Sequence, residues 1–104
     1  MKIEVKKLCE AKQFSKAINL AMGLPEDRAQ NLIAISEFLK AEKKGEGRDH
    51  LLKELIFALV ERVGMDGIKM AIPLFELFSD RNSAKQLEAG VLQKAEALHG
   101  SFIS

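Results

Sequence analysis

The apolar residues of this chain recur every three or four positions along most of its length, which is the spacing of helices that bury one face. Turn residues, chiefly glycine and proline, interrupt that pattern at intervals. We therefore expect six helical segments, at residues 3–12, 15–22, 25–43, 49–63, 66–78 and 83–99. The alternation of charged and apolar residues over positions 2–6 also suits a β-strand. No other segment offers a partner strand, so a helix is expected there as well.

Polar residues at the starts of these segments are candidate helix caps. A short oxygen-bearing side chain before the first helical turn can accept hydrogen bonds from backbone N–H groups that lack a partner. Pro25 suits the first position of the third helix, where no N–H is needed. The expected caps of the second, fourth, fifth and sixth helices are Ser15, Asp49, Asp66 and Ser83, the last in a capping box with Gln86.

Two segments carry apolar residues over more than half of their circumference. The third helix does so around Ile33, Ile35 and Phe38, which predicts cover on two sides and a central position. The fifth helix contains Pro73, which removes one backbone hydrogen bond. Because Pro73 lies beside Lys69 on the polar side, we expect a bend around the core rather than two separate helices.

The fourth helix has one apolar half and one polar half, and Phe57 lies on the polar half. Its neighbours there include Lys53, Glu54 and Glu61. We hypothesise that Lys53, Phe57 and Glu61 belong to a partner-contact surface. Alternatively, the first two helices or the C-terminal tail cover Phe57. Phe102, in the short apolar tail, is a further candidate contact, either packed back onto the last helices or exposed to a partner.

The composition supports an all-α fold in a single domain, residues 1–104, packed as about six helices in antiparallel hairpins. A chain of 104 residues can bury a core without a disulfide or a metal. It has no tryptophan or tyrosine, residues that β-structure concentrates. Sixteen basic residues against fifteen acidic ones argue against a nucleic-acid partner. A compact bundle and an α-solenoid-like stack both fit these observations.

The single cysteine, Cys9, excludes an internal disulfide and fits a reducing compartment. Its apolar neighbours Val5 and Leu8 favour a buried thiol over a reactive one. The charged N-terminal segment does not have the pattern of a signal peptide, and no apolar run approaches the length of a membrane span. We therefore expect a cytoplasmic protein with no membrane partner.

The sequence offers no convergent set of catalytic or metal-binding residues. His50 and Glu54 lie one helical turn apart, but a zinc site needs three or four ligands, so a solvated surface pair is the better interpretation. His99 suits a role at the C-terminus of the sixth helix. The glycines at 45 and 47 lack the strand and the lysine of a phosphate-binding loop. We expect no catalytic residue, cofactor or metal, and no enzyme activity.

Part of the chain recurs. Residues 14–35 and 65–89 each indicate a helix, a turn that contains Asp-Arg, and a second helix. Residues 11–21 have the order F-x-x-A-I-x-x-A, and with residues 29–39 they resemble tetratricopeptide-type helical hairpin repeats. The longer spacing from Pro25 to Asp66 is similar to that of HEAT-type helix pairs. This resemblance implies a scaffold that binds a peptide or a partner helix in a groove, without enzyme activity.

We therefore expect a non-catalytic protein–protein interaction module, a scaffold or adaptor whose partner is another protein or peptide. Such a scaffold would have a groove lined by the helices that carry Ile35 and Phe57. Two alternatives stay open. One is a small regulatory or chaperone-like homodimer that buries Phe57 or Phe102 at a two-fold axis. The other is a six-helix, death-fold-like adaptor that assembles through charged faces.

Overall fold

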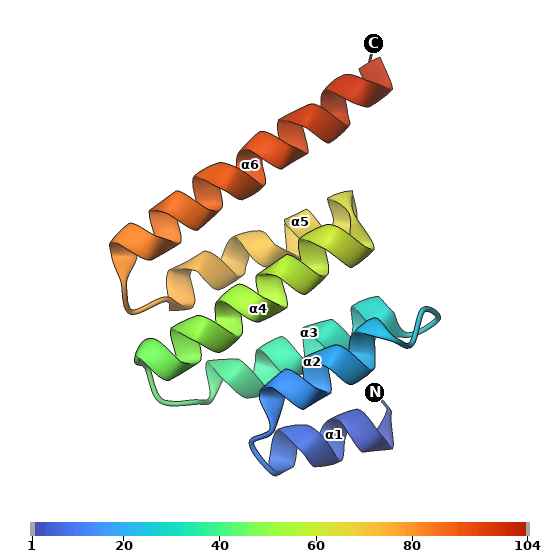
Figure 1. The fold of residues 1–104 in the computed structure, drawn as a ribbon, viewed down its shortest axis with the longest axis vertical. Helices are drawn as coiled ribbons and strands as arrows, with labels where there is room; N and C mark the ends of the chain where they lie inside the picture. The colour runs from blue at the N-terminus through green and yellow to red at the C-terminus, as the bar shows by residue number, and fades with distance from the viewer. Residues whose placement is uncertain (1, 104) are drawn as a thin grey trace.

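The computed structural model describes the backbone of residues 2–103 and the side chains of residues 2–98. Every regular element in that part of the chain is helical, which confirms the all-α prediction. The helices are α1 (Ile3–Glu10), α2 (Phe14–Met22), α3 (Arg28–Lys40), α4 (Glu46–Val63), α5 (Met65–Ala71), the 3₁₀ helix η1 (Ile72–Leu77) and α6 (Arg81–Ile103). Successive helices run in opposite directions, except that the 3₁₀ helix η1 continues α5 (Figure 1).

The helices stack in chain order along the longest dimension of a molecule that measures 45 × 33 × 15 Å. Helices α2 and α4 form one layer, and α3 and α5 lie behind them in a second layer (Figure 1). Helix α1 closes one end of the stack against α2 and α3, while α6 closes the other against α5 and η1. Each helix therefore packs mainly against helices that are near it in the sequence.

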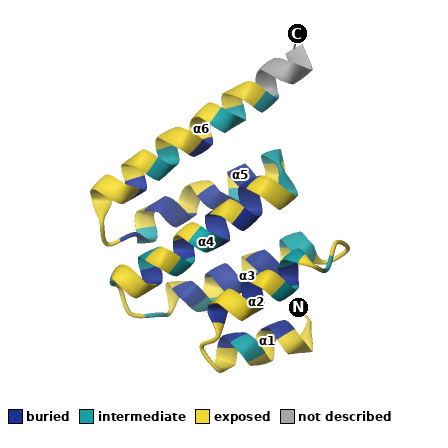
Figure 2. Ribbon diagram, viewed as in Figure 1, coloured by how far each residue is buried: buried dark blue, intermediate teal, exposed yellow. Residues whose placement is uncertain are grey.

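Helix α4 is the centre of the core, because α2, α3, α5 and η1 all pack against it. The helix expected to be central, α3, buries Ile35 completely but leaves Ile33 42 % exposed. The wide apolar arc predicted for α3 is thus covered only in part, since α3 lies in an outer layer. Figure 2 shows the buried residues gathered on the facing sides of the inner helices, whereas α6 is buried along a narrow stripe. The fully buried side chains of α4 are Leu52, Leu55, Ile56 and Leu59.

None of the four residues expected to cap a helix occupies the cap position. Ser15 and Asp66 are the second residues of their helices, Asp49 is the fourth and Ser83 is the third. Each helix begins one to three residues earlier than the polar residue suggests. Phe14, for example, precedes Ser15 and is buried as the first residue of α2.

Asp80 provides the cap of α6 that was expected from Ser83. The Asp80 Oδ1 atom accepts hydrogen bonds from the backbone nitrogens of Asn82 and Ser83, at 3.1 and 3.3 Å. Ser83 donates its hydroxyl to the other carboxylate oxygen at 2.8 Å. A carboxylate can accept all three of these bonds at once, and it also carries the negative charge that a helix N-terminus favours.

Helix α3 is shorter than expected at both ends. Pro25 belongs to a turn, and the helix begins at Arg28, whose Nε donates to the carbonyl oxygen of Met22 at 3.0 Å. The helix ends at Lys40 rather than near Lys43. There the chain turns away, and the carbonyl of Glu42 accepts a hydrogen bond from Arg48 on the next helix.

The chain stays helical through Pro73, but its hydrogen-bonding pattern changes there. Helix α5 ends at Ala71, and the 3₁₀ helix η1 begins at Ile72 with Pro73 in its first turn. Proline has no N–H to continue the α-helical pattern, which explains a change of helix type in place of the expected bend in one α-helix. Pro73 is exposed, as its position beside polar residues predicts.

Three arginines near helix starts secure the connections between helices. Each guanidinium donates to the carbonyl six residues earlier, at the end of the preceding helical segment: Arg28 to Met22, Arg48 to Glu42, and Arg81 to Phe75. Arg28 and Arg81 are the first residues of α3 and α6, so the two Asp-Arg pairs seen in the sequence take equivalent positions. These bonds link the start of each helix to the chain at or just beyond the end of the helical segment before it.

Candidate functional site

The exposed side of α4 carries the residues that the sequence singled out. Phe57 is 47 % exposed, so the described segments cover only about half of it. Its neighbours at helical spacing, Lys53 and Glu61, are exposed as well. Helix α4 lies in the front layer between α2 and α6 (Figure 1). Phe57 is therefore a large aromatic side chain presented to solvent among charged residues.

A groove of about 580 Å³ runs between α2 and α4, and Phe57 forms part of its wall. The walls combine apolar and charged side chains. Sequence reasoning identified Phe57 and Glu61 but missed the other members. The lining residues are Asn19 and Met22 from α2, and Glu54, Phe57, Ala58, Glu61 and Arg62 from α4.

Two polar contacts tie α4 to its neighbours beside this groove. The Ser15 hydroxyl on α2 donates to Glu54 Oε2 at 2.8 Å. Lys94 on α6 forms an ion pair with Glu61, with 2.7 Å between Nζ and Oε1. Both carboxylates of the groove therefore have partners within the protein. Glu61, expected to contact a partner, joins α4 to α6 in this structure.

Two basic residues of α4, Lys53 and Arg62, are not paired. Among the side chains of residues 2–98, neither Lys53 nor Arg62 has a hydrogen-bond or ion-pair partner, and both are exposed. Arg62 lines the groove beside Phe57. Their charges are therefore free to interact with a bound molecule, whereas those of Glu54 and Glu61 are partly satisfied.

Lys53 does not line the Phe57 groove. It borders a second hollow, of about 780 Å³, between the start of α4 and residues 78–83, together with His50 and Asp49. The predicted contact residues thus divide between two hollows, with Phe57 and Lys53 one helical turn apart on α4. The side chain of Phe102, the fourth predicted contact, lies outside the described residues, as does that of His99.

The carboxylates near the second hollow have structural hydrogen bonds. Asp49 accepts from the backbone nitrogens of Ser79 and Asp80, at 2.9 and 3.0 Å, and from the Ser79 hydroxyl at 2.8 Å. Partial burial raises the pKa of Asp49, but these hydrogen bonds outweigh it and lower the pKa below its ordinary value. Asp49 therefore fastens the start of α4 to the turn before α6.

Cys9 is buried in the core, as expected, and its thiol is protonated at neutral pH. Burial, with a smaller contribution from the charge of Glu10, raises the pKa of Cys9 to about 11.

His50 is exposed, and Glu54, one turn away, bonds to Ser15. Among the described side chains, no three His, Cys, Asp or Glu residues come close enough to hold a metal ion. In the same part of the chain, none of the helices combines the length and apolar character that crossing a membrane requires.

No protein-family model, curated protein or solved structure matches this chain.

Proposed function

We propose that this protein is a non-catalytic interaction module that binds an amphipathic segment of another protein along α4, with Phe57 as the main apolar contact. The observation that carries the proposal is the 47 % exposure of Phe57 beside a groove of about 580 Å³. Apolar side chains exposed next to a hollow of this size favour burial against a partner, and aromatic residues dominate the energetics of such contacts.

The unpaired charges indicate the chemistry of the partner. Lys53 and Arg62 lie before and after Phe57 along α4 but project from opposite sides of the helix, and only Arg62 lines the groove with Phe57. Lys94 neutralises Glu61, whereas Glu54 accepts only from the neutral Ser15 hydroxyl and keeps its charge, so Arg62 is the cation of the groove that lacks a partner within the protein. An acidic segment with an apolar side chain for Phe57 and a carboxylate for Arg62 would complement this groove.

A second exposed apolar pair provides a comparison. Ile33 and Ile72, each 42 % exposed, lie on α3 and η1 in the other layer. The hollow that Ile33 borders encloses about 220 Å³, less than half the volume of the Phe57 groove. Ile72 is therefore a matched control: a large apolar side chain with similar exposure, outside the proposed surface.

The proposal is tested by selecting binding peptides from a random peptide-display library on the immobilised protein. Selected peptides should combine apolar residues at helical spacing with acidic residues, and should shift the NMR signals of residues near Phe57. We expect Phe57→Ala to weaken their binding by at least about tenfold, as for a central interface residue. Arg62→Glu should also weaken binding, while Ile72→Ala should leave it unchanged.

Stability measurements separate a binding role from a packing role. A half-exposed phenylalanine leaves little cavity when truncated, so Phe57→Ala should lose well under the roughly 3 kcal/mol typical of a buried phenylalanine. A loss of that size would mean that Phe57 belongs to the core. Peptides that bind equally well to Phe57→Ala and to the wild-type protein would refute the proposed surface.

A further inference from the structure

We propose that a second copy of this chain docks on the outer side of α6, with the two α6 helices antiparallel. The surface, called here the α6 stripe, consists of Lys85, Ala89, Leu92 and Glu96. These residues are spaced by four, three and four positions, so they lie along one side of the helix. All four are exposed. This proposal does not depend on the function proposed for Phe57.

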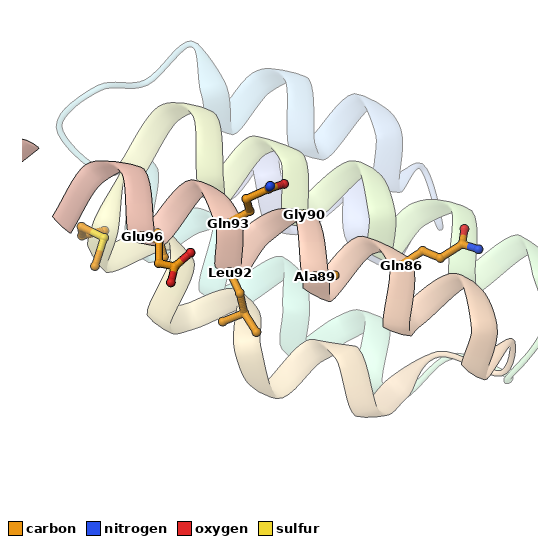
Figure 3. A pocket seen from close by; sticks show the side chains of 8 residues that line it. Gln86, Ala89, Gly90, Leu92, Gln93 and Glu96 are labelled. Atoms are coloured by element: carbon orange, nitrogen blue, oxygen red, sulfur yellow. The ribbon is translucent and has the colours of Figure 1, made fainter. Parts of the chain in front are cut away.

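The fold leaves the α6 stripe without cover from its own chain. Helix α6 packs inward through a narrow line of residues, of which Ala84 and Val91 are buried. Leu92 is 48 % exposed, although it lies in the middle of the described helix. Figure 3 shows Leu92 and Glu96 projecting from one side of α6, opposite to Gln93, around a hollow of about 930 Å³.

The charges at the two ends of the α6 stripe favour a second copy of this chain as the binding partner. Consider two α6 helices that pair antiparallel about a two-fold axis passing between residues 90 and 91. Lys85 of one copy then faces Glu96 of the other, and the reverse pair forms by symmetry. Within each copy, and among the described side chains, neither Lys85 nor Glu96 has an ion-pair partner. The stripe is therefore complementary to itself in charge.

The same register also matches large side chains with small ones. Leu92 of each copy lies opposite Ala89 of the other. Small residues beside the axis let two helices approach to the usual 8–10 Å, and each leucine fills the space above a small neighbour. Parallel pairing would place Lys85 against Lys85, so it would lose both the match of opposite charges and the match of large with small side chains.

The expected association is weak. One pair of helices buries an area at the low end of specific interfaces, below about 1,200 Å² in total, which corresponds to transient complexes. We therefore expect dimers that dissociate on dilution, detectable by sedimentation equilibrium between about 10 µM and about 1 mM. A protein that stays monomeric throughout this range would overturn the proposal.

A charge-swap experiment tests the register. Either Lys85→Glu or Glu96→Lys places like charges at both of the pairs that join residue 85 of one copy to residue 96 of the other. Each variant alone should therefore dimerise at least about tenfold more weakly than the wild-type chain. An equimolar mixture of the two variants should regain dimerisation as a heterodimer, because both pairs again join opposite charges. Recovery in the mixture also shows that the single variants are folded.

Two controls separate this interface from other modes of association. Lys16→Glu makes the same charge change at an exposed position of α2 and should leave dimerisation unchanged. Phe57→Ala should also leave it unchanged, which distinguishes failure of this proposal from failure of the proposed function. Single variants that associate as well as the wild-type protein, or a mixture that does not recover, would overturn the α6 pairing.

Discussion

Two glycines determine how closely α4 and α5 approach each other. Gly64 alone joins Val63, the last residue of α4, to Met65, the first of α5, with φ +78° and ψ −139°. That backbone conformation is one that residues with a side chain rarely adopt. Gly67 then lies against α4, since a Cβ atom there would be 2.0 Å from the carbonyl oxygen of Leu59. The tight contact between these two helices therefore needs glycine at both positions.

We predict that Gly67→Ala destabilises the protein by about 2–3 kcal/mol, because the atom that the new methyl meets belongs to the backbone and cannot move aside cheaply. Urea unfolding followed by circular dichroism measures this loss. Gly47→Ala is the control, because a Cβ atom at Gly47 meets nothing within 4 Å. The stability of this variant should equal that of the wild-type protein or exceed it by up to about 1 kcal/mol. Equal stability for both variants would contradict the close approach at Gly67.

At the scale of elements, hydrogen bonds made by side chains join the start of α4 to the ends of other helices. Asp49, in the first turns of α4, accepts three bonds from Ser79 and Asp80, which precede α6. Arg48 beside it is buried and donates to the carbonyl oxygens of Glu42 and Leu77. The start of α4 is thus linked to the ends of both α3 and η1. Such contacts connect elements far apart in sequence without adding apolar surface.

The Asp49 contacts predict a loss of stability in acid. The hydrogen bonds lower the pKa of Asp49 below its ordinary value of 3.8, so its contribution to stability is present above that pH. The contribution is lost as the pH falls through the lowered pKa. We expect Asp49→Asn to be less stable than the wild-type protein at about pH 5, and the difference to shrink by about pH 2.5. Urea unfolding at both pH values measures it, and a constant difference would contradict the role assigned to Asp49.

At the scale of the whole molecule, the stack gives its helices unequal cover. Helix α4 has neighbours on several sides, whereas α1 and α6 each pack on one side only. Figure 2 shows the same contrast, with α6 mostly exposed. A helix with cover on one side can separate from the stack while the remaining helices keep their contacts. The two ends should therefore open more readily than the centre.

Hydrogen exchange followed by NMR tests this order of stability. Backbone amides of α4 should exchange slowest, at the rate of global unfolding, and those of α1 and described α6 should exchange faster through local opening. Hydrogen exchange should be measured at low protein concentration, where any dimer formed through α6 is dissociated. Equal exchange rates in α4 and α6 would mean that the molecule opens only as a single unit.

The position of Phe57 illustrates how far a candidate site can be predicted from the sequence. Helical periodicity alone places Phe57 on the polar side of its helix, because that position depends only on spacing along one element. The groove beside it could not be predicted, since Asn19 and Met22 belong to a helix more than thirty residues earlier in the chain. Likewise Ile35 lines no part of the Phe57 groove, because α3 lies behind α4 and Ile35 is completely buried.

The apolar spacing by itself determined the helical class, the approximate helix positions and the inward sides of most helices, because these depend on neighbours three and four residues apart. Only the tertiary structure decided where the helices begin and which polar residues hold them. Asp80 rather than Ser83 caps α6, and Asp49 bonds to Ser79 across the chain. Asp80 accepts from N–H groups two and three residues later, so its choice depends on where α6 begins, whereas the Asp49 bond depends on packing that brings residues thirty positions apart together.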